Sequence, residues 1–263
     1  MNNFKDKVAL ITGAATGIGL QIALQLAEQG ARLVINDLCI KNGQAAQKQI
    51  QSAGGSCLLV LGDAAQQNVM EQMVKVAVGT YGQLDFCIPN AAKTHFSSFW
   101  DLDYEALESL LRLNLTGAFM LSQLAAKQMR KQVKGGKILL MSSNVGSQAY
   151  PHLSAYSMSK AALQMMARSL VLELSPYGIT INALAPGATI TPRTLQDDPA
   201  YEVNWQALIP LQKVAQATEI AAAALFLLSD AANHITGQTL VVDGGWTQQA
   251  QYPPITHPTT SNQ

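Results

Sequence analysis

Short apolar runs alternate along the chain with longer stretches in which apolar residues recur at helical spacing. The short runs are continuous rather than alternately apolar and polar, which is typical of parallel strands covered on both faces. The predicted strands are Val8–Thr12, Arg32–Asn36, Cys57–Leu61, Leu84–Ile88, Lys137–Met141, Thr180–Leu184 and Thr239–Val242. The predicted helices are Gly17–Gln29, Gly43–Ser52, Asn68–Tyr81, Tyr104–Lys131, Ser154–Leu174 and Thr218–Leu228.

This regular alternation predicts an α/β fold, a Rossmann-type doubly wound parallel sheet of about seven strands with helices on both faces. No repeat or interdomain linker interrupts residues 1–249, which we expect to form a single domain. Residues 250–263 are rich in Gln, Thr and Pro, and we expect a tail that is disordered or docked on a neighbouring subunit. The longest irregular segment is Pro192–Pro210, and so long a loop in a compact domain is usually functional.

The composition limits the classes of partner. Charged residues make up 13% of the chain and the formal net charge is +0, which argues against binding to nucleic acid or to an anionic membrane. No stretch approaches the roughly 18 uninterrupted apolar residues that a membrane helix needs. So few charges also suggest that part of the surface is covered, most simply by copies of the same chain.

The N-terminal residues lack the apolar segment of a signal peptide. The cysteines Cys39, Cys57 and Cys87 lie in or beside apolar runs and form no CxxC pair. We expect them to be buried free thiols in a reducing compartment, which makes the cytoplasm the expected location.

A glycine-rich turn follows the first predicted strand and precedes the first predicted helix. Gly13, Gly17 and Gly19, with Thr16 and Ile18 between them, allow a tight turn and a close approach of the backbone to a pyrophosphate. The free N–H groups and positive dipole end of the helix would face the phosphates. In this position the motif predicts a dinucleotide site, with an ordinary Gly-rich β–α turn as the alternative.

Asp37 ends the second predicted strand, about 20 residues past the glycines, where a carboxylate hydrogen-bonds the adenosine ribose. Thr16 and Leu38 occupy the two positions where an Arg or Lys side chain could bind the 2′-phosphate of NADP. These positions predict NAD as the cofactor. The alternative is that Asp37 only forms a turn.

From about residue 5 to residue 246 the chain resembles the short-chain dehydrogenase/reductase family in its common single-domain form. The likeness rests on several motifs in register, including the glycine turn, Ser143 after the fifth strand, and Tyr156 with Lys160 in a YxxxK pattern. Two residues depart from the family's Asn-Asn-Ala-Gly motif, because Pro89 replaces its first Asn and Ala92 its Gly. Pro89 has no N–H to donate, so the fourth strand should end just before it.

The resemblance implies a role for each remaining motif. It makes Asn114, Ser143, Tyr156 and Lys160 the catalytic residues, with Asn114 holding a water on a proton relay toward Lys160. It also implies that Tyr156 and Lys160 contact the cofactor. The other implied cofactor contacts are Gly13, Thr16, Gly17, Ile18, Gly19, Asp37, Leu38, Asp63, Ala64, Asn90, Ala91, Ala92, Pro186, Gly187, Thr189 and Thr191.

Tyr156 would accept the proton of an alcohol while hydride passes to the nicotinamide. A free Tyr, with a pKa of about 10, is almost wholly protonated at neutral pH. Lys160 stands at i+4 on the same helical face, and a nearby ammonium favours the phenolate, as does the positive nicotinamide ring. We therefore expect the pKa of Tyr156 to be depressed to roughly 7–8. Ser143 would stabilise the charge that develops on the substrate oxygen.

The substrate contacts are less specific than the catalytic motif. The expected contacts are Ser143, Gln148, Tyr156, His95, His152 and Trp205. His95 and His152 have an alternative interpretation as ordinary loop histidines. No His, Cys and Asp cluster has metal-ligand spacing, so no metal is expected. A serine hydrolase would need a G-x-S-x-G elbow after a strand, and the sequence has none there.

Together these features predict an NAD(H)-dependent oxidoreductase that interconverts a secondary alcohol and its carbonyl compound. The segment Asp243–Trp246 resembles that of sugar or polyol dehydrogenases, which favours such a substrate. The alternatives are a 3-oxoacyl-thioester reductase, which usually uses NADPH, and a non-catalytic dinucleotide-binding regulatory protein. The helices Tyr104–Lys131 and Ser154–Leu174 are apolar around much of their circumference, which predicts a homotetramer or at least a dimer. The family resemblance implies that these two helices pair across a two-fold axis.

Overall fold

The main sheet of the computed structural model, which describes residues 4–249, has seven strands, all parallel, in the order β3-β2-β1-β4-β5-β6-β9. These strands are β1 (Val8–Thr12), β2 (Arg32–Asp37), β3 (Ser56–Leu61), β4 (Phe86–Ile88), β5 (Gly136–Met141), β6 (Ile179–Pro186) and β9 (Thr239–Val242). The predicted doubly wound sheet is therefore confirmed. β4 also ends at Ile88, immediately before Pro89, as expected.

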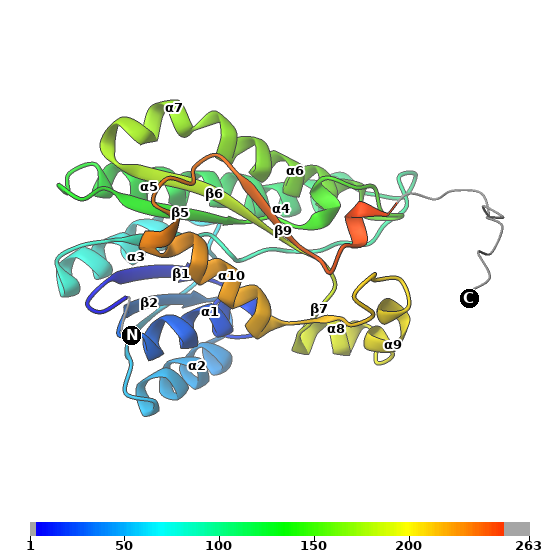
Figure 1. Cartoon of the computed structure of the whole chain (residues 1–263), viewed down its shortest axis with the longest axis horizontal. Helices are drawn as coiled ribbons and strands as arrows, with labels where there is room; N and C mark the ends of the chain where they lie inside the picture. The colour runs from blue at the N-terminus through cyan, green and yellow to red at the C-terminus, as the bar shows by residue number, and fades with distance from the viewer. Residues whose placement is uncertain (1–3, 250–263) are drawn as a thin grey trace, which may run out of the picture.

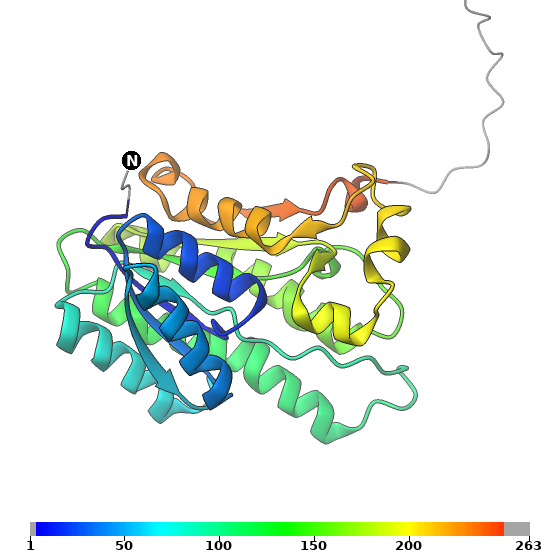
Figure 2. The same cartoon turned by 90° about the horizontal axis from the view of Figure 1, so that it is seen from below.

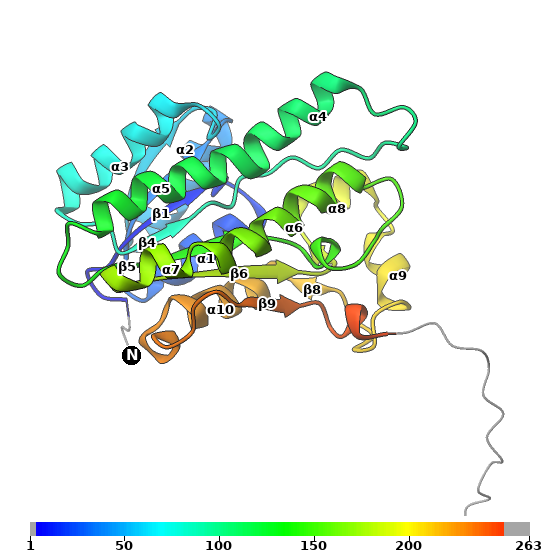
Figure 3. The ribbon, with the colours of Figure 1, turned by 90° about the horizontal axis from the view of Figure 1, so that it is seen from above.

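Helices cover both faces of the sheet (Figures 1 and 2). One layer is formed by α1 (Gly17–Glu28), α2 (Ile40–Ser52) and α10 (Ala217–Leu228). The opposite layer, nearest the viewer in Figure 3, is formed by α3 (Gln67–Tyr81), α4 (Tyr104–Leu111), α5 (Ala118–Met129), α6 (Ser154–Ser169) and α7 (Val171–Leu174). Alternate strand residues enter the two cores, Ile11 the first and Leu10 the second. Because both faces of the sheet are covered, the strand centres carry apolar residues at consecutive positions rather than at alternate ones.

The strand order reverses at β1, which pairs with β2 on one side and with β4 on the other. Such a switch point forms a crevice at the carboxyl ends of the strands, and ligands bind there in open α/β sheets. The fold thus places the glycine turn and the segment after Pro89 next to each other at this edge of the sheet.

Two predicted long helices are interrupted. Between α4 and α5 lies a π-helical turn, η1 (Arg112–Gly117), and α6 is separated from α7 at Leu170. A π turn inserts one extra residue into the helical ladder and often marks a functional site. In this turn the Asn114 side chain bonds to the Lys93 backbone rather than to its own helix.

The prediction of an irregular loop at Pro192–Pro210 is wrong, because the segment contains α8 (Pro192–Asp197) and α9 (Tyr201–Gln206). Thr191 and Thr194 form a capping box at the start of α8, with Pro192 at its first position. Each helix is too short to show apolar periodicity. We call residues 191–214 the α8–α9 flap; its base is closed by β7 (Thr189–Ile190) pairing with β8 (Ala215–Gln216).

Cys57 and Cys87 are buried free thiols as predicted, but Cys39 is exposed. The correction has a simple cause, because Cys39 lies beyond the end of β2, outside the sheet, and precedes α2. The predicted tail, residues 250–263, lies outside the described residues. Among the helices of residues 4–249, none combines the length and apolar character needed to cross a membrane.

Candidate active site

The glycine turn after β1 is built by close backbone contacts. Gly13 and Gly17 have φ angles of +59° and +57°, which L side chains rarely adopt. A Cβ on Gly13 would lie 2.9 Å from the Cα of Ala91, and one on Gly19 would lie 2.5 Å from the Nδ2 of Asn90. Glycine is therefore required where the loops after β1 and β4 meet.

The residues around this turn fit the phosphates of a dinucleotide. Thr16, the N-cap of α1, makes no side-chain capping hydrogen bond, so the first N–H groups of the helix remain available to an anion. Thr12 was not among the predicted contacts, yet its Oγ1 accepts hydrogen bonds from the N–H groups of Asn90 and Ala91, both at 3.0 Å. In the sequence, the only sign of this structural role was a hydroxyl residue directly after the apolar run of the first strand.

Asp37 lies beside the glycine turn, as predicted. Its carboxylate accepts hydrogen bonds from the N–H of Ala15 at 3.3 Å and from the N–H of Cys39 at 2.9 Å. The Leu38 side chain next to it is 72% exposed. Asp63 follows the neighbouring strand β3, where its Oδ1 accepts from the N–H of Ala65. The arrangement leaves a carboxylate at the place where an adenosine ribose would lie.

The structure brings Ser143, Tyr156 and Lys160 together at the carboxyl edge of the sheet. Ser143 follows β5, and the other two lie in the first turns of α6. The Lys160 Nζ is 5.4 Å from the centroid of the Tyr156 ring and donates to the Met141 carbonyl at 2.7 Å. The side chains of Thr94 and Ser143 lie close enough to Tyr156 to lower its pKa against the effect of burial. The hydroxyl of Tyr156 is therefore the point where these side chains converge.

The electrostatics of this cluster differ from the expectation. Burial raises the pKa of Tyr156 above its ordinary value, against the opposing effects of the Arg193 charge and of hydrogen bonds from Thr94 and Ser143. Burial and the Arg193 charge lower the pKa of Lys160 to about 7. The predicted depression of the Tyr156 pKa by Lys160 is therefore wrong for this structure, because desolvation outweighs charge attraction.

Asn114 joins three parts of the site. Its Oδ1 accepts from the N–H of Lys93 at 2.8 Å, and its Nδ2 donates to the Lys93 carbonyl at 2.9 Å and to the Ser159 Oγ at 3.1 Å. Ser159 in turn donates to the backbone carbonyl of Tyr156. Asn114 thus ties the segment after β4 to α6. The water relay toward Lys160 stays a prediction.

Gln164 is a positioning residue that the sequence did not single out. Its Nε2 donates to the Ser142 Oγ and to the Ser143 carbonyl, both at 3.2 Å, and its Oε1 accepts from the Ser147 Oγ. The side chain is buried, 7% exposed. A polar residue one helical turn beyond Lys160, on the same face of α6, was the signal available in the sequence.

The opposite wall of the crevice follows β6. The Ser143 Oγ lies 3.5 Å from the Pro186 carbonyl, and the buried Thr189 donates to the Gly187 carbonyl. A Cβ on Gly17 would lie 3.3 Å from the Cγ2 of Thr191. The segment after β6 therefore spans the distance from Ser143 to the glycine turn, and its contacts with a nicotinamide stay a prediction.

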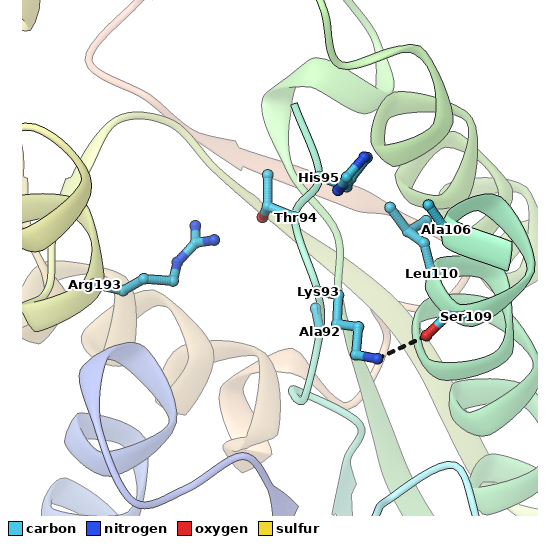
Figure 4. A pocket seen from close by; sticks show the side chains of 8 residues that line it. All are labelled: Ala92, Lys93, Thr94, His95, Ala106, Ser109, Leu110 and Arg193. Atoms are coloured by element: carbon cyan, nitrogen blue, oxygen red, sulfur yellow. Dashed lines mark hydrogen bonds between the residues drawn. The ribbon is translucent and has the colours of Figure 1, made fainter. Parts of the chain in front are cut away.

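A cavity of about 410 Å³ opens between the segment after β4 and α8 (Figure 4). Two of its lining residues, Thr94 and Arg193, act on the pKa of Tyr156, so the cavity lies near that side chain. Of the predicted substrate contacts only His95 lines the cavity. Ser143, Gln148, His152, Tyr156 and Trp205 are not among its lining residues. Trp205 instead stacks on Tyr150, with ring centroids 5.8 Å apart. The residues that line the cavity are Ala92, Lys93, Thr94, His95, Ala106, Ser109, Leu110 and Arg193. Thr94 and Arg193 were not predicted to line this cavity. They lie in segments far apart in the chain, Thr94 after β4 and Arg193 in α8.

Within residues 4–249 no cluster of three or more His, Cys, Asp or Glu side chains is arranged to hold a metal ion.

Known proteins resemble this chain over most of its length. A family model described as Enoyl-(Acyl carrier protein) reductase matches residues 13–247. The chain is 35% identical to an L-rhamnose 1-dehydrogenase (NAD(P)(+)) of Azotobacter vinelandii, over 91% of this chain and 96% of that protein. It is 36% identical to a 3-oxoacyl-(acyl-carrier-protein) reductase of Staphylococcus aureus, over 91% and 97%. The crystal structure of a short-chain type dehydrogenase/reductase from Mycobacterium marinum aligns with a TM-score of 0.88 at 31% identity, covering 94% of this chain and 97% of that one.

Proposed function

Because the chain belongs to the short-chain dehydrogenase/reductase family of oxidoreductases, we propose that it interconverts a secondary alcohol and its carbonyl compound with NAD(H) as the cofactor. The observation that carries the proposal is the convergence of Ser143 and Lys160 on Tyr156, beside a crevice whose glycines and free helix N-terminus fit a dinucleotide. A regulatory protein that only bound the nucleotide would have no need of that cluster.

When bound, the nicotinamide supplies the group that accepts or donates hydride. Ser143 holds the substrate oxygen by a hydrogen bond, and Tyr156 exchanges a proton with that oxygen. Since burial raises the pKa of Tyr156, its hydroxyl stays protonated at neutral pH and suits proton donation to a carbonyl. Lys160 holds the nicotinamide ribose, and its ammonium form stabilises the phenolate when the alcohol is oxidised.

The choice of NAD rests on Asp37, whose carboxylate is held beside the glycine turn by two backbone N–H groups. The two nearby positions where a basic residue could bind a 2′-phosphate hold Thr16 and Leu38 instead. A sugar or polyol is the favoured alcohol. The relative from Azotobacter vinelandii, an L-rhamnose 1-dehydrogenase by name, supports that class. The 3-oxoacyl-thioester reductase alternative has its own relative at similar identity, but the absence of a cation for the 2′-phosphate weighs against it.

The test is the replacement of Tyr156 by Phe, with NADH absorbance followed on a panel of sugars, polyols and simple secondary alcohols. The change removes the proton acceptor and keeps the ring, so kcat should fall by about 10²–10⁴-fold. NADH affinity, measured by fluorescence titration, should remain near that of the wild type. Tyr81→Phe on α3, remote from the crevice, is the matched control. A Tyr156→Phe enzyme that kept more than about a tenth of the wild-type kcat would show that Tyr156 is not the base.

A further inference from the structure

Basic side chains surround the cavity beside Tyr156. Lys93 and His95 come from the segment after β4, and Arg193 extends from α8 on the opposite side, pointing toward Thr94 (Figure 4). The cavity lining contains no Asp or Glu. The chain as a whole has 17 acidic and 17 basic residues, so this local excess of positive charge is a property of the cavity rather than of the composition.

Among the basic residues that line the cavity, Arg193 is the one whose charge acts on both Tyr156 and Lys160. Its charge lowers the pKa of Tyr156 and that of Lys160, so the guanidinium lies within electrostatic reach of both. The ion pairs found within residues 4–249 involve other cations, and none includes Arg193. Lys93 differs, because its ammonium already donates to the Ser109 Oγ at 2.7 Å.

We propose that the substrate carries a carboxylate or phosphate in addition to its alcohol or carbonyl, and that Arg193 binds this oxyanion. The proposal rests on the proposed function of the same site. A guanidinium offers parallel N–H donors that match both oxyanions, and it keeps its charge at every physiological pH. A neutral alcohol in the cavity would leave this donor fork unused. Lys93 and His95 on the facing wall favour the same sign of ligand charge.

The test is a binding measurement on the NADH-loaded protein, read by the fluorescence of Trp205 and Trp246 or by calorimetry. The probes are lactate, 3-hydroxybutanoate and 4-hydroxypentanoate with their methyl esters, and glycerol 3-phosphate with glycerol. We expect at least one anionic probe to bind about 10–100-fold more tightly than its neutral counterpart. If the hydroxy acids bind more tightly than their esters, the site prefers a carboxylate. If glycerol 3-phosphate binds more tightly than glycerol, the site accepts a phosphate.

Arg193→Met should remove that preference, and Arg193→Lys should retain part of it. Arg130→Met is the control, since Arg130 stacks on Tyr177 at the other end of the sheet. Equal binding of acids and esters, no binding of any anion, or an Arg193→Met variant that lost NADH affinity rather than anion affinity would overturn the proposal. Alcohol oxidation by the same protein variants, supplied with NAD in place of NADH, tests the proposed function separately. If Arg193→Met oxidises neutral sugars with the kinetics of the wild type, the proposed function stands and the oxyanion site is overturned.

Discussion

Lys160 lies beneath the Tyr156 ring with only 3% of its surface exposed, and its ammonium nitrogen donates to the Met141 carbonyl. Transfer out of water disfavours a charged side chain, and the Arg193 charge acts in the same direction, so the pKa of Lys160 falls to about 7. A lysine with that pKa can hold or release a proton near neutrality. The same burial costs stability, because unfolding restores the ordinary pKa of 10.5.

Replacing Lys160 by Met should reveal that cost. Between pH 7 and 10.5 the folded Lys160 is neutral while the unfolded one is protonated. Unfolding then takes up a proton, and the contribution of Lys160 to the free energy of unfolding becomes more favourable as pH rises. The stability advantage of Lys160→Met should therefore shrink by about 1.4 kcal/mol per pH unit across this window. Urea unfolding of the cofactor-free protein at a series of pH values measures it.

The control for this experiment is Lys131→Met, because Lys131 is exposed in the fold and its surroundings change little on unfolding. Its stability relative to the wild type should not vary with pH. Parallel pH curves for the Lys160→Met protein and the wild type would mean that Lys160 keeps its charge in the folded state.

Asp37 should set the choice of cofactor. Its carboxylate would face the 2′-phosphate of NADP, and like charges about 4 Å apart repel by about 4 kcal/mol at an effective dielectric of 20, before further screening. We expect kcat/KM to favour NAD by roughly a hundredfold. Asp37→Ser combined with Leu38→Arg removes the repulsion and adds a phosphate-binding guanidinium, so it should erase or reverse the preference. If the wild type used NAD and NADP equally well, Asp37 would serve only to form the turn and would not determine the choice of cofactor.

At the scale of elements, the α8–α9 flap is attached to the body of the molecule by stacked rings. Trp205 of α9 stacks on Tyr150 with ring centroids 5.8 Å apart and meets Trp246 edge-on at 5.7 Å. Tyr150 precedes α6, and Trp246 follows β9. Since α8 carries Arg193 and α9 carries Trp205, this aromatic cluster fixes the position of a cavity wall.

Trp205→Ala should loosen the flap without touching the catalytic cluster. The loss of these ring contacts is expected to raise the KM for the alcohol by about tenfold and to leave the KM for NAD nearly unchanged. Faster proteolytic cleavage within residues 191–214 would accompany it. Trp205→Phe retains a ring and should remain close to the wild type. An alanine variant with unaltered KM and cleavage rate would show that the flap holds its position without the cluster.

Apolar side chains are exposed on α5 and α6, two helices of the layer that lies nearest the viewer in Figure 3. Met158 and Met165, seven positions apart on α6, are 57% and 58% exposed, and Phe119 on α5 is 40% exposed. Residues at this spacing share one helical face. Such a face is normally covered, and the predicted homotetramer, which stays a prediction, would cover it with a second copy of α5 and α6.

Light scattering should therefore give the mass of a tetramer, or at least of a dimer, at micromolar concentration. Met158→Glu combined with Met165→Glu places charges at this face and should lower the mass. Val133→Glu adds a charge at a fully exposed position elsewhere and should not. A wild-type protein that is a stable monomer at that concentration would contradict the prediction.

The sequence by itself determined the sheet, the glycine turn and the catalytic spacing. Continuous apolar runs identify strands buried on both faces, whatever lies beyond them. The close approach at Gly13 and Gly19 excludes a Cβ, so those positions are recognisable in the chain. Tyr156 and Lys160 share a helical face because of the helix repeat alone. Each of these features depends on local sterics or on the periodicity of burial.

Only the tertiary structure decided the rest. The Asn114 side chain, in the π-helical turn η1, bonds to the Lys93 backbone because tertiary packing brings that backbone within reach. The helices α8 and α9 are too short for their sequence pattern to identify them. The cavity joins Thr94 to Arg193 across loops far apart in the chain. The direction of the Tyr156 pKa likewise depends on how completely water is removed from its hydroxyl. Desolvation and long-range contact are properties of packed neighbours, and no local pattern in the chain specifies which neighbours those will be.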